Sequence, residues 1–162
     1  MDTRQAEPAE IPQQFLDYLE SRPEIVAAYL FGSVAAGRAH KFSDVDVALL
    51  LTDSMDSMRK WDLRLEAMGE AEAAFRRRAD VVIINDVGLV FAFQILKGGR
   101  VILERDRATR CNWEMLARSE YYDYLPYLQY QQAEFLRRLK LEGLLYGYEQ
   151  RRRAAAKTQR IR

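Results

Sequence analysis

Two apolar segments, separated by a loop or short helix rich in small residues, place the strongest constraint on how this chain folds. Residues 25–31 (IVAAYLF) and 45–51 (VDVALLL) are short apolar runs with polar or glycine-containing flanks, which predicts two buried strands. The loop begins with Gly32-Ser33 and ends with Asp44, and Asp46 follows inside the second run. Because residues i and i+2 of a strand face the same side, Asp44 and Asp46 are expected to present neighbouring carboxylates.

Helix and strand patterns alternate along the rest of the chain. A short helix is predicted after Pro12, a long amphipathic helix over about 54–77, and a third strand over 80–84. Asp86 is expected to cap a short apolar helix that ends at Gly98-Gly99. The apolar face of the long helix is predicted from residues at helical spacing, namely Met58, Trp61, Leu65, Met68 and Phe75.

This order of elements predicts an α/β (α+β) fold, in which helices flank a small mixed β-sheet and a helical segment follows at the C-terminus. From about residue 109 the chain has a helical pattern, with one interruption expected near Pro126. We expect four parts along the chain. They are a loose N-terminus over 1–10, a core over 11–108, a helical segment over 109–150 packed on the core, and a basic tail over 151–162.

Charge and composition argue against several classes of protein. The chain has 162 residues and a net charge of +1, but residues 151–162 hold six basic side chains and no acidic one. Residues 1–150 therefore carry 19 basic and 24 acidic side chains, and this negative body argues against a nucleic-acid partner. A single cysteine, Cys111, and a single histidine, His40, argue against zinc sites rich in Cys or His. Without a signal peptide or a membrane-length apolar run, the sequence predicts a cytoplasmic protein.

The residues around the loop suit a triphosphate and a divalent cation. Gly32 would let the backbone approach a phosphate closely, Ser33 offers a hydroxyl, and Gly37 keeps the turn open. Paired carboxylates repel unless a cation lies between them, and their oxygens suit Mg²⁺, which substrate phosphates and water normally complete. Asp80, at the start of the third strand, is a candidate third carboxylate for a metal or for a proton. Taken alone, the acidic pair also suits a turn at a strand entry.

Gly32-Ser33, then Asp44-x-Asp46, then a later aspartate on a strand resembles the pattern of the DNA polymerase β-like nucleotidyltransferase superfamily. The small size is similar to its minimal nucleotidyltransferase (MNT) branch, the antitoxins of HEPN/MNT toxin–antitoxin pairs. The resemblance implies Mg²⁺-dependent transfer of AMP from ATP to a hydroxyl, in this branch a tyrosine of a partner HEPN-type ribonuclease toxin. The implied roles are triphosphate binding by Gly32 and Ser33, Mg²⁺ binding by Asp44 and Asp46, and completion of the triad by Asp80.

One position departs from the pattern of the superfamily. Many members have arginine where this chain has Ala36, and Arg38 or Lys41 would have to supply the missing cation. Two alternatives therefore stay open. The chain could neutralise a partner by binding alone, with a catalytically weak site, or it could modify a small molecule, as aminoglycoside nucleotidyltransferases do.

Overall fold

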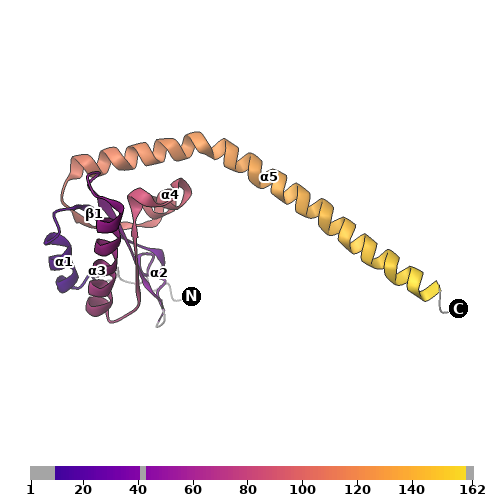
Figure 1. The fold of residues 1–162 in the computed structure, drawn as a ribbon, viewed down its shortest axis with the longest axis horizontal. Helices are drawn as coiled ribbons and strands as arrows, with labels where there is room; N and C mark the ends of the chain where they lie inside the picture. The colour runs from indigo at the N-terminus through magenta and orange to yellow at the C-terminus, as the bar shows by residue number, and fades with distance from the viewer. Residues whose placement is uncertain (1–9, 41–42, 160–162) are drawn as a thin grey trace, which may run out of the picture. The chain divides into compact units, whose positions relative to one another are not determined.

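A four-stranded mixed sheet organises the N-terminal part of the computed structural model, which describes residues 10–40 and 43–159 and side chains as far as Leu141. The strand order is β3-β2-β1-β4. Figure 1 shows the helices α1, α3 and α4 around the strands. β1 (Ile25–Phe31) pairs antiparallel with β2 (Val45–Leu51) and with β4 (Arg100–Glu104), whereas β2 pairs in parallel with β3 (Ala79–Ile83). The two strands predicted at 25–31 and 45–51 and the mixed sheet are thus confirmed.

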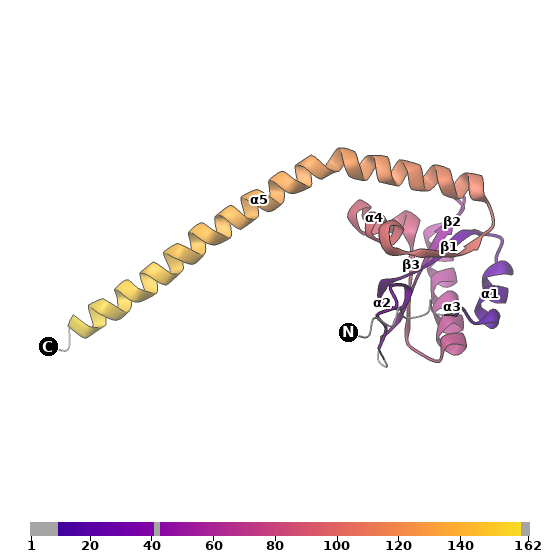
Figure 2. The same ribbon diagram turned by 180° about the vertical axis from the view of Figure 1, so that it is seen from behind.

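Helices cover both faces of this sheet (Figure 2). α1 (Gln13–Glu20) and α3 (Ser57–Phe75) pack with one side of the strands in the larger apolar cluster. α4 (Leu89–Gly98) and the first turns of α5 (Arg107–Gln159) pack with the other side. Two short elements connect these layers, α2 (Gly32–Ala35) after β1 and a 3₁₀ turn, η1 (Ile84–Asp86), after β3.

The buried face of α3 differs from the one predicted. Its fully buried positions, spaced four residues apart, are Leu63, Ala67 and Ala71. Three of the predicted residues are exposed, namely Met58, Trp61 and Leu65. Met68 and Phe75 pack partly buried against the cluster. The prediction was based on the large apolar side chains. In the structure the alanines face the sheet, because their small size lets the helix lie close to it.

The cap predicted for α4 is also wrong. Gly88 occupies the N-cap position of α4, and Asp86 lies earlier, in η1, where its carboxylate pairs with Lys60 at 2.7 Å. By contrast, Asp56 caps α3 by accepting a hydrogen bond from the backbone N–H of Arg59 at 2.9 Å. An N-cap carboxylate acts only on the turn that directly follows it, so Asp86 is placed too early to cap α4.

α5 runs without a break through Pro126, so the predicted interruption there is wrong. A proline removes one backbone hydrogen bond from a helix, but the surrounding turns keep theirs. The chain divides into two compact units, Met1–Tyr121 and Tyr122–Arg162, and α5 contributes to both. The predicted loose N-terminus falls almost wholly on residues 1–9, which lie outside the described residues, as do the side chains of the basic tail.

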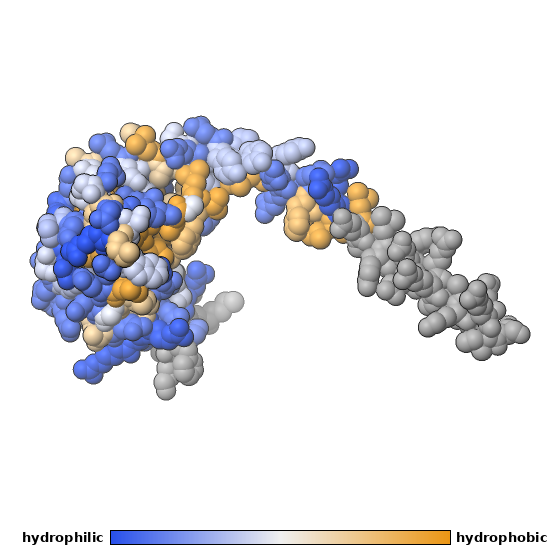
Figure 3. Space-filling view, viewed as in Figure 1, coloured by the Kyte–Doolittle hydropathy of each residue, from blue (hydrophilic) through white to orange (hydrophobic). Residues whose placement is uncertain are grey.

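The described part of the second unit carries many exposed apolar and aromatic side chains. Hydrophobic and hydrophilic side chains both appear on its surface (Figure 3). They include Tyr122, Tyr124, Tyr127, Tyr130, Phe135, Leu136, Leu139 and Leu141. Charged residues are interspersed among them, so the segment is not apolar throughout. Among the described residues, no helix combines the length and the apolar character that crossing a membrane requires.

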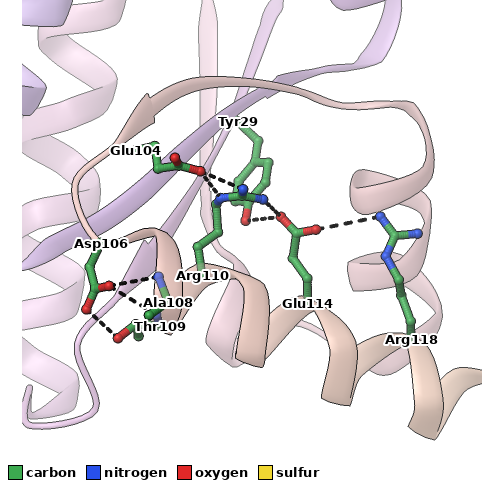
Figure 4. Close-up of polar contacts among 8 residues, drawn as sticks. All are labelled: Tyr29, Glu104, Asp106, Ala108, Thr109, Arg110, Glu114 and Arg118. Atoms are coloured by element: carbon green, nitrogen blue, oxygen red, sulfur yellow. Dashed lines mark hydrogen bonds and ion pairs between the residues drawn. The ribbon is translucent and has the colours of Figure 1, made fainter.

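A half-buried ion network ties the start of α5 to the sheet (Figure 4). Arg110, whose side chain is 15% exposed, pairs with both Glu104 on β4 and Glu114 on α5. The Tyr29 hydroxyl donates to Glu114 at 3.0 Å, and burial, together with that carboxylate, raises the pKa of Tyr29. The hydroxyl therefore keeps its proton and remains a donor. Asp106 caps the same end of α5 by accepting from the N–H of Thr109 at 3.1 Å.

Replacing Arg110 by Met should lower the free energy of unfolding by about 3 kcal/mol, because it leaves two half-buried carboxylates without their cation. Chemical denaturation measures this change. The matched control is Arg59→Met, which removes the more exposed pair with Glu24 and should lower the free energy by a clearly smaller amount. Equal losses of unfolding free energy for the two variants would show that the network around Arg110 stabilises the fold no more than the exposed pair of Arg59 and Glu24 does.

Candidate functional site

Three side chains form a row across the sheet at the end where β1 runs into α2. The antiparallel pairing of β1 and β2 sets Phe31 opposite Asp46, and the parallel pairing of β2 and β3 sets Asp46 beside Asp80. Their strand neighbours Leu30, Val47 and Val81 belong to the larger core cluster, so the row lies on the opposite face. Asp46 therefore has an aromatic ring on one side and a second carboxylate on the other.

Gly32 and Asp46 are in direct contact. A side chain at position 32 would place its Cβ 2.0 Å from Oδ2 of Asp46, so the carboxylate occupies the space that only glycine leaves free. Gly32 also has a φ of 71°, a conformation that other residues rarely adopt. The sequence suggested that this glycine makes room for a phosphate. In the structure, the group that approaches it closely is the carboxylate of Asp46.

Ser33 and Gly37 lie at the two ends of the short helix α2. Ser33 is its second residue and is partly exposed. Gly37 has a φ of 64° and follows the helix, where the N–H of Arg38 donates to the carbonyl of Ser33 at 2.9 Å. The N–H of Gly37 donates to the carbonyl of Val34 at 3.2 Å, which completes a common glycine-terminated helix end. Helix termination accounts for Gly37, and its predicted part in nucleotide binding stays a prediction.

The three aspartates differ in their surroundings. Asp44 is exposed immediately before β2, and Asp46 is partly buried. Burial first, and then the charges of Asp80 and Asp44, raise the pKa of Asp46. A cation near this carboxylate would counter both charge effects.

Arg64 of α3 stands beside the third carboxylate. Its Nη2 lies 3.4 Å from Oδ1 of Asp80, and its Nε donates to the carbonyl of Val81 at 2.5 Å. The Asp80 side chain is 59% exposed, so water weakens this pair. Sequence reasoning missed Arg64, because its position depends on how α3 packs along the edge strand β3 and leaves no local signal.

The donors at this end of the sheet fit a hard divalent cation in kind. They are carboxylate oxygens, which Mg²⁺ prefers, and substrate phosphates and water normally supply the remaining ligands. Among the described residues, no three Asp, Glu, His or Cys side chains converge into a complete protein-built site. The pairing of Asp80 with Arg64 is consistent with this, since that carboxylate is directed to a protein cation.

The position of the expected arginine is open to solvent. Ala36 is the exposed C-cap residue of α2, and Arg38 is exposed two residues later. Lys41, the other cation considered for this place, lies outside the described residues. Ser43 is buried and accepts a hydrogen bond from the N–H of His40 at 2.9 Å, which closes the loop just before the acidic pair.

A sequence profile of the family described as polymerase beta, nucleotidyltransferase matches residues 13–108. The chain belongs to this family. Those residues include β1, α2, β2 and β3, and hence the row formed by Phe31, Asp46 and Asp80, which we call the acidic row. The family membership agrees with the resemblance seen in the Gly32-Ser33 and Asp44-x-Asp46 motifs.

The chain is also similar to individual proteins. The chain is 30% identical over 78 residues to the protein adenylyltransferase MntA of Shewanella oneidensis, covering 48% of this chain and 53% of that protein. It thus spans about half the length of this curated relative. The fold is shared with a toxin–antitoxin structure containing AMP-PNP, at 22% identity and a TM-score of 0.63, over 75% of this chain and 96% of that one.

A variant of the toxin–antitoxin complex MntA–HpeT gives a similar result. The TM-score is 0.65 at 20% identity, over 76% of this chain and 97% of that one. At these identities the two structures show the fold alone. They also leave about a quarter of this chain without a counterpart.

Replacing Gly32 by Ala should lower the free energy of unfolding by at least about 1–2 kcal/mol, because it forces alanine into a left-handed conformation. The new Cβ must also displace the carboxylate of Asp46. The matched control is Gly69→Ala in α3, where no atom lies within 4 Å of the new Cβ. This control should raise stability by up to about 1 kcal/mol. Denaturation curves with the same sign for both variants would contradict the crowding seen at Gly32.

Replacing Asp46 by Asn should raise the free energy of unfolding of the metal-free protein at about pH 7. The pKa of Asp46 is raised in the folded chain, so its carboxylate destabilises the fold once the pH exceeds that raised value. As the pH falls below the ordinary value of 3.8, the group is protonated in both folded and unfolded chains. The advantage of the variant should then disappear.

Chemical denaturation in EDTA, from acidic to neutral pH, measures the effect of Asp46→Asn. Asp53→Asn is the control, since Asp53 is exposed just beyond the opposite end of β2. An advantage of the Asp46 variant that grows as the pH falls would refute the account of its raised pKa.

Proposed function

We propose that this chain is a Mg²⁺-dependent adenylyltransferase that moves AMP from ATP to a hydroxyl of a partner protein. The observation that carries the proposal is the contact between Gly32 and Asp46, with Asp80 on the neighbouring strand. It brings the glycine-serine turn and the acidic residues to one end of one sheet. The similarity to the protein adenylyltransferase MntA supports a protein acceptor, and a tyrosine of a HEPN-type ribonuclease toxin is the acceptor we propose.

The proposed reaction is an in-line displacement at the α-phosphorus of ATP. The acceptor oxygen bonds to that phosphorus, the bond to the β-phosphate oxygen breaks, and pyrophosphate leaves. Gly32 and Ser33 would position the triphosphate beside Asp46, and the proton of the acceptor hydroxyl would pass to Asp80 or to water. We propose the cytoplasm as the compartment, because ATP is available there.

Asp44 and Asp46 are the residues we propose as ligands of Mg²⁺, with Asp80 as a third ligand once it leaves Arg64. When bound, the metal would neutralise charge on the phosphate oxygens during displacement. The chain's own task would be to hold the two reacting groups in line, since side chains do little covalent work in this kind of transfer.

A second function is favoured by two observations. Ala36 stands where the resemblance to the superfamily leads us to expect arginine, and Asp80 is paired with Arg64. Both fit a chain that neutralises its toxin by binding alone, with little or no transfer. The two functions predict different outcomes when the acidic pair is removed.

Incubation of the chain with a candidate HEPN ribonuclease, ATP and Mg²⁺ should add AMP-sized masses to a tyrosine of that partner. Asp44→Asn and Asp46→Asn should each slow the transfer by at least about a hundredfold, because they remove charges that would hold the cation against the phosphates. Intact-mass spectrometry and peptide mapping measure the product, and EDTA should abolish it. Asp53→Asn, at the other end of β2, should transfer AMP at the rate of the unaltered chain.

Ribonuclease assays separate the two functions. If neutralisation of the partner is lost with the Asp44 and Asp46 variants while binding persists, the chemistry is required. If the partner is never modified, although the chain binds ATP and neutralises the toxin, the binding function replaces the adenylyltransferase.

A further inference from the structure

The exposed ring of Phe91, in α4, lies at the Phe31 end of the acidic row. Phe31 lies opposite Asp46 in the β1–β2 pairing and directly precedes Gly32. The ring of Phe91, from the first turns of α4, meets the ring of Phe31 edge to face, with centroids 5.9 Å apart and planes at 75°. Phe91 therefore stands next to the residues that we propose for the triphosphate and the metal.

Phe91 is far more exposed than the apolar residues that follow it in α4. Phe93 is 7% exposed and stacks on Tyr121, with ring centroids 3.7 Å apart. Ile95 and Leu96 are buried in the cluster on this face of the sheet. Phe91 is 44% exposed, although burying an aromatic ring would stabilise the fold. The helix α4 thus presents an exposed aromatic ring beside Phe31, at the acidic end of the sheet.

We propose that Phe91, supported by Phe31, stacks against the adenine ring of ATP and is a binding residue for the base. This inference rests on the proposed function. If the triphosphate lies at Gly32 and Ser33 beside Asp46, the base is the uncharged, planar part of the same molecule and needs an uncharged surface nearby. Phe91 offers that surface, whereas the opposite side of Asp46 carries Asp80 and Arg64. Aromatic side chains commonly bind bases through such stacking.

Trp61 is the competing aromatic residue near the row. It is 53% exposed on α3 and lines a cavity of about 250 Å³ along β3. The guanidinium of Arg64 lies over its ring, 5.5 Å from the centroid, so a protein cation already covers one face. It also belongs to the helix layer on the other side of the sheet. Trp61 is therefore the matched control for Phe91.

The test compares the affinities of the full chain for ATP and for inorganic tripolyphosphate, which lacks the base, by calorimetry in the presence of Mg²⁺. Phe91→Ala should raise the Kd for ATP by about tenfold and leave the Kd for tripolyphosphate within about twofold. Phe91→Leu, which keeps an apolar side chain in α4 and protects the fold, should also weaken ATP binding. Phe91→Trp should retain ATP affinity and should show fluorescence that changes with ATP but not with tripolyphosphate. Trp61→Ala should bind both ligands as the unaltered chain does.

Each outcome bears on a different claim. Unchanged ATP affinity in Phe91→Ala and Phe91→Leu overturns the inference and leaves the proposed function intact. Equal weakening of ATP and tripolyphosphate also overturns it, because the ring would then act on the phosphates or on the fold. Loss of ATP affinity in Trp61→Ala alone would place the base on α3 and contradict the assignment to Phe91. If the unaltered chain binds neither ligand, the proposed function itself fails.

Discussion

The contact between the Asp46 carboxylate and the backbone of Gly32 determines the geometry of this end of the molecule. Pairing of β1 with β2 brings the two strand ends together, but a side chain at position 32 would overlap Oδ2 of Asp46. The left-handed φ of Gly32 then starts α2 directly after the strand. Because Gly32 has no Cβ, the start of α2, the end of β1 and the carboxylate of Asp46 can lie close together. The positions of Ser33 and of the acidic row depend on this close approach.

This arrangement places the carboxylates of Asp44, Asp46 and Asp80 near one another, where their mutual repulsion does not stabilise the fold. Burial and two neighbouring carboxylates raise the pKa of Asp46, which means that its ionised form opposes folding. Arg64 offsets part of the repulsion at Asp80 only, and that pair is half-exposed. The opposing contributions come from elsewhere, from the apolar clusters on both faces of the sheet and from the network around Arg110. Strain of this kind is expected where a cation is to bind.

The sequence predicts well what depends on neighbouring residues in the chain. The strands at 25–31 and 45–51 and the motif between them follow from local pattern, and the structure has the strands with those bounds. The buried face of α3 could not be found in this way, because alanines carry little weight in a hydrophobic pattern although they decide how closely a helix approaches. Arg64 beside Asp80 and Phe91 beside Phe31 join residues that are distant in the chain. Only tertiary packing brings such pairs together, so no spacing rule reveals them.

The strand order gives the two sides of Asp46 different access. β3 is an edge strand, so Asp80 lies at the border of the sheet, where its side chain is largely exposed. β1 is an interior strand with α4 packed over its face, so Phe31 is bordered by the chain itself. The interior side can enclose a small ligand, whereas the exposed edge of the sheet leaves room for a group carried by another macromolecule. For the adenylyl transfer that we propose, this topology favours entry of the acceptor past β3 and Asp80, with the nucleotide on the side of Phe91.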